Sequence, residues 1–304
     1  MLKLIMLPLL ALCFVFVALL AVAGCAICAF AMRDEARRTV ELSAPVEGTA
    51  AFAAEMHNGS IAATGADTAE YTVTATVKAR AGSEERAREL AEATAVALVP
   101  GESGVRLDVD KPKTRMNESI NVHIDAVLPR ETALSFKTHN GGVSVAEMDG
   151  DVTVITHNGG VNASHLAGAL DAETHNGGIN CTNCTGGAEL KTYNGGIDCR
   201  EAAGDVTAVT HNGGVDVAYS EDAGPVKQIV LETHNGSISL DAPDDFAGAV
   251  DIRSSRGSVR TDLPILLESF DRRSIAGHIG EGDGMLRLKT RNGSIRAGQA
   301  EHGR

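Results

Sequence analysis

The sequence predicts an all-β fold, a parallel β-solenoid built from coils of about 18 residues. Three observations support this fold: a motif that returns at a fixed step, apolar and polar residues that alternate between its copies, and an aromatic content of only 3%. The motif reads Thr-His-Asn-Gly-Gly followed by Val or Ile, with Tyr in place of His once. Its asparagines stand 18 residues apart four times in succession, at Asn140, Asn158, Asn176, Asn194 and Asn212. A strict period of this kind is typical of stacked identical units.

Between the motifs, the residues show the period of two that marks a β-strand with one buried face. In the unit that opens at Gly150, Val152, Val154, Val161 and Ala163 are apolar and have polar neighbours. The three following units are apolar at the same positions, so each unit offers two strands that break at Asn-Gly-Gly and at the opening glycine. We expect the glycines that follow the asparagines to supply the positive φ of the turn. These are Gly141, Gly159, Gly177, Gly195 and Gly213.

The motif is compatible with two folds. Asn-Gly between alternating apolar residues is a strong signal for a β-hairpin, which would give an antiparallel meander. A solenoid would instead stack each coil on the next at about 4.8 Å. We favour the solenoid because the units are most alike at one offset, as expected where like side chains form a ladder. The asparagines are predicted to be buried corner amides that hydrogen-bond to their copies and to the turn backbone. This structural ladder comprises Asn140, Asn158, Asn176, Asn194, Asn212, Asn235 and Asn292.

Further elements follow from drifted copies and local patterns. Asn58 belongs to an isolated first copy, Asn235 follows after a step of 23 residues, and residues 255–259 form a degenerate copy before the last clear one at Asn292. Residues 71–77, 105–109 and 120–128 alternate as strands. A helix is predicted over 84–98, since Ser83 is a good N-cap and Pro100-Gly101 ends the pattern.

The N-terminal segment predicts membrane attachment. Residues 4–32 are apolar and carry no charge, and a bilayer span needs about 20 such residues. Three interpretations stay open: an uncleaved anchor, a lipoprotein signal with lipid on Cys25, or a secretory signal cleaved after residues 29–31. We expect a chain that is anchored through residues 4–32, with the solenoid outside the cytoplasm, in the periplasm or at the cell surface.

The chain therefore divides into three parts: an anchor or signal segment (1–33), N-terminal strands with a capping helix (34–129), and the repetitive solenoid (130–304). It resembles the bacterial putative-adhesin domains, a family of unknown function with repeated Thr-x-Asn-Gly-x-Ile coils, over about residues 38–297. The shared features are Asn58-Gly59, the helix near 84–98, Leu128-Pro129 and residues 275–282. The resemblance implies a β-helix with an adhesin label that rests on fold analogy.

Three cysteines lie in the array. Cys181 and Cys184 form a C-x-x-C pair, which can act in redox chemistry or bind metal. However, Cys181 and Cys199 occupy the same inward position in successive units, and Cys184 takes the place of Leu166. We interpret all three as buried, metal-free core residues. A Cys181–Cys199 disulfide between coils is the alternative in an oxidising compartment.

Stacked coils would also align histidines along one corner, with Tyr193 interrupting the row. These are His139, His157, His175, His211 and His234. Neighbouring imidazoles could share a transition metal, but a metal site needs three or four converging ligands and a single row points them the same way. We therefore interpret them as solvent-facing turn residues, with no metal site. On this interpretation Asn176→Leu lowers the melting temperature clearly and His175→Ala barely changes it.

Function is predicted to be binding and not catalysis. The sequence holds no nucleophile elbow, no His-Glu-x-x-His and no Walker loop, so we expect no catalytic residue and no cofactor. A net charge of -13 disfavours nucleic acid and anionic lipid surfaces as ligands of the soluble part. The expected partner is an unknown envelope protein or glycan. The alternatives are an envelope stress-sensing or signalling domain and a carbohydrate-active enzyme, which would need a cleft with paired carboxylates.

Overall fold

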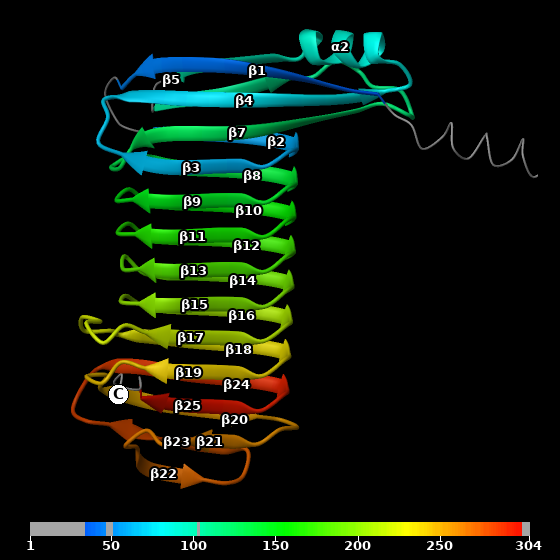
Figure 1. Ribbon diagram of the computed structural model, residues 1–304. Helices are drawn as coiled ribbons and strands as arrows, with labels where there is room; N and C mark the ends of the chain where they lie inside the picture. Colours follow the sequence, from blue (N-terminus) through cyan, green and yellow to red (C-terminus); the bar gives the residue numbers. More distant parts are fainter. Residues whose placement is uncertain (1–33, 47–50, 102–103, 300–304) are drawn as a thin grey trace, which may run out of the picture. The chain divides into compact units, whose positions relative to one another are not determined.

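The computed structural model describes residues 34–46, 51–101 and 104–299, which fold into two long β-sheets and one α-helix (Figure 1). The predicted membrane segment, with Cys25, lies outside these residues. No helix within the described ranges is long and apolar enough to span a membrane. The described chain forms two compact units, a small one within residues 34–38, 77–94 and 111–120 and a large one that holds the repeats.

The first sheet, sheet A, has 12 strands. In spatial order they are β1 (Asp34–Pro45), β4 (Glu70–Ala81), β7 (Ser119–Pro129), β3 (Ile61–Ala66), β9 (Val143–Met148), β11 (Val161–Leu166), β13 (Ile179–Cys184), β15 (Ile197–Ala202), β17 (Val215–Tyr219), β19 (Ile238–Ala242), β25 (Ile295–Gln299) and β21 (Val259–Thr261).

The second sheet, sheet B, has 13 strands. In spatial order they are β22 (Leu266–Phe270), β23 (Ser274–Ile279), β20 (Gly248–Ser254), β24 (Gly284–Asn292), β18 (Gln228–Asn235), β16 (Val206–Asn212), β14 (Ala188–Asn194), β12 (Leu170–Asn176), β10 (Val152–Asn158), β8 (Ala133–Asn140), β2 (Ala51–Asn58), β6 (Gly104–Asp110) and β5 (Ala95–Gly101).

Each 18-residue unit contributes one strand to each sheet, and like strands pair in parallel. Asn158 stands opposite Asn140 on one side and Asn176 on the other, and the register continues without a shift to Asn212. The prediction of parallel coils in register is therefore confirmed, and the antiparallel meander is excluded. The nearly all-β structure with long parallel sheets is consistent with a β-solenoid.

The core of a coil is a thin layer between the two sheets. In the coil of β12 and β13, Leu170, Ala172, Ile179 and Cys181 are at most 2% exposed. Since each side chain meets only its counterparts above, below and across, small and branched residues fill this space and no tryptophan is needed. Near the first repeat, the ring of Phe52 packs against the rings of Tyr71 and Phe136.

The drifted copies join the same stack, but not in chain order. The first copy is not isolated, because β2 pairs directly with β8 and places Asn58 opposite Asn140. The last copy is not at the end, because β24 lies between β18 and β20. Figure 1 shows β24 and β25, the red end of the chain, between the strands of two earlier coils. The extra residues of the 23-residue step lie in the loop that follows β17, so Asn235 still stands opposite Asn212.

The helix α2 (Glu84–Ala93) is shorter than predicted. Ser83 is its N-cap, as expected, and its Oγ accepts from the backbone N–H of Arg86 at 3.3 Å. The helix ends at Thr94, whose Oγ1 donates to the carbonyl of Leu90 at 2.8 Å. The prediction of helix over 95–98 was wrong, because these residues belong to β5 and pair antiparallel with β6. An available partner strand outweighs the weak helical preference of this segment.

A left-handed residue recurs in four successive coils and explains the cysteine arrangement. Glu147, His165, Asn183 and Glu201 have φ between 52° and 60°. At Asn183 this bend lets Cys181 and Cys184 both point inward, three residues apart, and the structure joins them by a disulfide.

The inter-coil alternative, a disulfide from Cys181 to Cys199, is therefore wrong. Cys199 is a free, buried thiol, and desolvation by burial raises its pKa to about 12. The predicted burial of the three cysteines is confirmed, since each is at most 2% exposed. Cys184 stands in register with Leu166, as the sequence indicated.

Candidate ligand-binding surface

The Asn-Gly-Gly corner is built on a ladder of buried threonines. The motif threonines are 1–6% exposed. Each Oγ1 donates to the carbonyl of the first motif glycine in the neighbouring coil, so Thr174 donates to Gly159 at 2.8 Å and Thr192 to Gly177 at 2.8 Å. The repeat predicted a ladder of like side chains at this offset, but only the asparagines were predicted as ladder site residues, and the threonines were not. Their strict recurrence two positions after an apolar residue, on the same face of the strand, was the signal that could have identified them.

The asparagines form a second ladder outside the core. The Nδ2 of each donates to the Oδ1 of its neighbour at 2.6–2.8 Å, in an unbroken series from Asn58 to Asn292. The series ends at Arg256, which takes the Asn position in the degenerate copy and donates to Asn292 Oδ1 at 3.2 Å. The prediction that these amides are buried was wrong: those in the regular coils are exposed. Asparagine ends its strand, so its side chain stands at the turn, beyond the edge of the core.

The residues before the asparagines form a continuous stack of aromatic rings. From His57 to His234, seven rings lie face to face with centroids 4.6–4.9 Å apart. Tyr193 does not interrupt the row, because its flat ring stacks between His175 and His211 with interplanar angles of 3°. The stack meets a cation at its end, where Arg291 Nη1 lies 3.0 Å from His234 Nε2.

A metal ion requires ligands that converge on a common point, and parallel rings do not converge. In the described part of the chain, no three His, Cys, Asp or Glu side chains are grouped so that they could hold a metal ion. A hollow of about 490 Å³ lies beside the stack and carries Glu55, Lys137 and Glu173. The stack therefore presents ring edges and a mixed-charge hollow to solvent.

The end of the stack is expected to make stability sensitive to acid. Desolvation by burial, His211, Arg291 and Arg256 all lower the pKa of His234 from 6.5. The unfolded chain then binds this proton at a higher pH than the folded chain, so stability is lost as pH falls from 6.5 toward the lowered value. We expect the melting temperature of the wild type to drop in this window more than that of His234→Gln. Equal drops, measured by circular dichroism, would contradict a contribution from His234.

The motif glycines are needed for a different reason from the one predicted. Of the five predicted turn glycines, only Gly213 has a positive φ, +158°, which is nearly extended. A Cβ on Gly177 would lie 2.1 Å from the carbonyl oxygen of Gly159 in the next coil. Close approach of neighbouring backbones therefore requires glycine here. The second glycine is looser, since a Cβ on Gly178 would lie 3.3 Å from Gly196 O.

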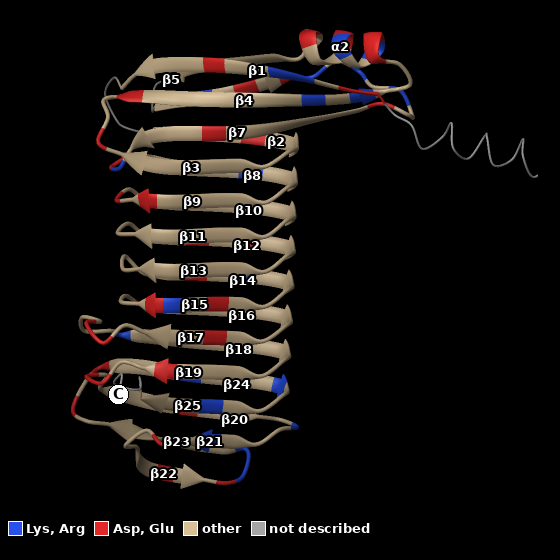
Figure 2. Ribbon diagram, viewed as in Figure 1, with Lys and Arg blue, Asp and Glu red and all other residues tan. Residues whose placement is uncertain are grey.

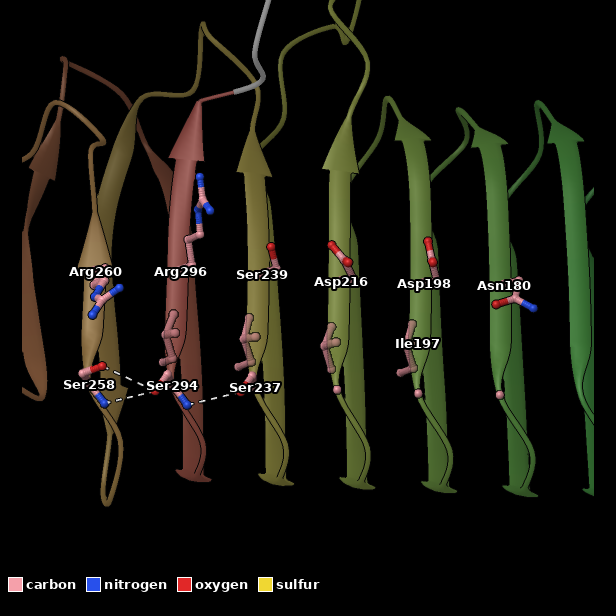
Figure 3. A pocket seen from close by; sticks show the side chains of 16 residues that line it. Asn180, Ile197, Asp198, Asp216, Ser237, Ser239, Ser258, Arg260, Ser294 and Arg296 are labelled. Carbon is pink, nitrogen blue, oxygen red and sulfur yellow. Dashed lines mark hydrogen bonds between the residues drawn. The ribbon is translucent and has the colours of Figure 1, made fainter.

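The bare second glycines help to form an open groove on sheet A, with a volume of about 770 Å³ (Figure 3). One side of the groove consists of Gly178, Gly196 and Gly214, followed at the same position by serines. The other side consists of the first outward-facing residue of each sheet A strand from β13 to β21 in spatial order. Figure 3 shows this row crossing neighbouring strands. In spatial order it reads Asn180, Asp198, Asp216, Ser239, Arg296 and Arg260.

The charge of the groove changes sign along its length. Asp198 and Asp216 lie on one side of Ser239, and Arg296 and Arg260 on the other. Asp198 is held by Arg200 through hydrogen bonds of 2.8 and 2.9 Å. Neither Arg296 nor Arg260 forms an ion pair with any carboxylate that the structure describes. The groove therefore offers two exposed guanidinium groups, without an ion pair among the described residues, beside hydroxyl and carboxylate groups, a set suited to a polar ligand with an anionic group.

Comparison with known proteins gives one clear family match. Residues 51–297 match the model of the family described as Toastrack DUF4097. No curated protein sequence matches the chain significantly.

Similar solved structures carry names that refer to adhesion or lipid. A putative adhesin from Bacteroides fragilis shares 14% identity, with coverage of 86% of this chain and 97% of that chain and a TM-score of 0.44. A putative cell adhesion protein from Clostridium sporogenes shares 10% identity, with coverage of 86% and 100% and a TM-score of 0.29. A putative lipid binding protein from Parabacteroides distasonis shares 12% identity, with coverage of 69% and 91% and a TM-score of 0.37.

Proposed function

The chain belongs to the Toastrack DUF4097 family, and we propose that it is a non-enzymatic binding scaffold of the cell envelope. The observation that carries the proposal is the sheet A groove. Its wall repeats at the coil spacing, so it presents polar and charged side chains at a regular interval to an extended ligand. The apolar residues 4–32 support a location at the envelope.

The groove favours binding over glycoside hydrolysis. A hydrolase needs two carboxyl groups that flank the scissile bond, one to donate a proton and one to act as base or nucleophile. Asp198 and Asp216 stand side by side in one row, opposite each other in the parallel pairing of β15 and β17. The guanidinium of Arg200 already engages Asp198. These carboxylates are placed to contact a ligand from one side and not to enclose a bond.

We propose that the ligand is an extended envelope polymer, protein or glycan, that places an anionic group against Arg260 and Arg296. Exposed arginines with a planar fork bind carboxylate and phosphate groups in two-point contacts. The acidic end of the groove, around Asp216, would accept hydrogen bonds from hydroxyl, amide or amino groups of the same ligand.

The test is binding of the full chain to arrays of envelope glycans and acidic peptides. We expect Arg260→Ala with Arg296→Ala to weaken binding by about tenfold or more, since each Arg contributes hydrogen bonds to a charged group. The matched control is Arg287→Ala with Lys289→Ala, which removes the same charge from exposed positions of β24 in sheet B. Binding that is equally weakened by both pairs, or by neither, would reject the groove as the binding site.

A further inference from the structure

The last strand of sheet B exposes large apolar side chains. In β22, Leu266 is 78% exposed, Leu267 54% and Phe270 69%. β22 is the edge strand and pairs only with β23 in the sheet order. Isolated exposed apolar residues are common on proteins, but Leu267 and Phe270 lie on the same face of this strand and form a patch that requires an explanation.

The patch is exposed because sheet A ends earlier than sheet B. Sheet A ends at β21, whereas sheet B continues past β20 through β23 and β22. Leu267 pairs with Gly277, which pairs with the buried Val250, and Phe270 pairs with Ile275, which pairs with the buried Ile252. Directly paired residues share a face of the sheet. Leu267 and Phe270 therefore continue the core face beyond the point where sheet A covers it.

Arginines lie next to this patch, and one exposed carboxylate, that of Glu268, lies within its strand. The hairpin from Phe270 to Ser274 carries Arg272 and Arg273, both exposed, and Figure 2 shows the blue hairpin next to β22. The carboxylate of Asp271 is occupied within the hairpin, where it accepts from the backbone N–H groups of Arg273 and Ser274.

Arg256 lies in the neighbouring loop, because Arg273 Nη1 donates to the carbonyl of Ser255 at 3.2 Å. Residues 251–296 carry nine Lys or Arg against six Asp or Glu, in a chain with a net charge of -13. The overall negative charge disfavours anionic lipid as a ligand of the soluble part as a whole. Residues 251–296 differ from this average because they carry an excess of positive charge.

Two features disfavour a second copy of the chain as the partner. A symmetric contact would bring the arginines of both copies together, and like charges at close range repel. The register of β22 also shifts between Leu267 and Ser269, and such a bulge disrupts the regular edge that another strand would extend. A flat anionic surface has neither problem.

We propose that this end of the solenoid docks on an anionic lipid bilayer. Leu267 and Phe270 enter the interface between headgroups and acyl chains, and Arg256, Arg272 and Arg273 contact lipid phosphates. Apolar side chains with adjacent cations are the combination that binds such interfaces. This surface is separate from the sheet A groove, so either proposal can fail without the other.

The absence of tryptophan from the chain allows a local test. Phe270→Trp places a single fluorophore at the patch, and Tyr193→Trp places one on the exposed aromatic stack as the control. The full chain is kept in phosphatidylcholine nanodiscs, which accommodate residues 4–32, and vesicles with brominated acyl chains are added. We expect vesicles that contain phosphatidylglycerol to quench Phe270→Trp and to leave Tyr193→Trp unquenched.

The charge requirement is tested in the Phe270→Trp background. Each arginine near an anionic surface contributes a similar amount to the free energy of binding. Arg272→Ser with Arg273→Ser should therefore raise the lipid concentration for half-quenching by roughly 30-fold. Unchanged melting temperatures would show that all variants fold. Absence of quenching by phosphatidylglycerol vesicles, or equal quenching by pure phosphatidylcholine vesicles, overturns the proposal. A lipid-free dimer that Phe270→Ser abolishes would also overturn it, in favour of a second copy.

Discussion

Replacing Gly177 with Ala is expected to destabilise the solenoid by about 3 kcal/mol or more. The new Cβ would lie 2.1 Å from the carbonyl oxygen of Gly159 and 2.5 Å from its carbonyl carbon. These are backbone atoms of the adjacent coil, so no side-chain rotation relieves the overlap and the coils must separate locally. Overpacking against rigid neighbours costs about 1–3 kcal/mol and occasionally more, and here it also interrupts the stack in its middle.

The neighbouring glycine is the matched control. A Cβ on Gly178 would lie 3.3 Å from Gly196 O, so Gly178→Ala should change the free energy of unfolding by no more than about 1 kcal/mol. Chemical denaturation of the two variants checks the difference. Equal stabilities would mean that the corner is looser than its geometry indicates.

Replacing Thr174 with Val is expected to cost about 1–3 kcal/mol. The substitution keeps the shape of the side chain but removes the hydroxyl that donates to Gly159 O at 2.8 Å. Thr174 is 2% exposed, so water cannot replace this donor easily, and a buried group without its partner carries the full desolvation penalty.

The structure changes the expected order of effects at this corner. Asn176 is exposed, so water can replace the ladder contacts that Asn176→Leu removes, and the loss should be smaller than for Thr174→Val. His175→Ala loses ring contacts with His157 and Tyr193, and such pairs contribute about 0.5–1.5 kcal/mol each. The histidine effect should therefore exceed the near-zero change predicted from a simple solvent-facing residue. Thermal melts of the three variants test this order, which is wrong if Asn176→Leu is the most damaging.

Much of the fold could be predicted because the repeat is local and strict. The 18-residue step alone places Asn140 to Asn212 in register, and the alternation of apolar residues identifies the buried face of each strand. The same pattern predicted the inward positions of Cys181, Cys184 and Cys199. These features depend on residues that are close in sequence or one period apart.

The candidate site was harder to predict because it depends on which coils become neighbours. The basic end of the groove exists because β25 and β21 follow β19 in space, which places Arg296 beside Ser239 and Arg260 beside Arg296. In the sequence, Arg260 comes before Arg296, and neither lies in the regular array. The ring stack similarly recruits His57, which is 82 residues from its neighbour His139.

The sequence by itself determined the period, the two strands of each coil and the identity of the side chains that repeat. Only the tertiary structure decided where the ladders stand relative to the core. Thr174 and Asn176 lie two residues apart and would share a face in a continuous strand, but the strand ends at Asn176, so Thr174 is buried and Asn176 is exposed. The tertiary structure also decided the reason for the glycines, since the separation between neighbouring backbones is a property of the stack. The out-of-order insertion of β24 and the uncovered edge at β22 follow from long-range pairing, which no local period encodes.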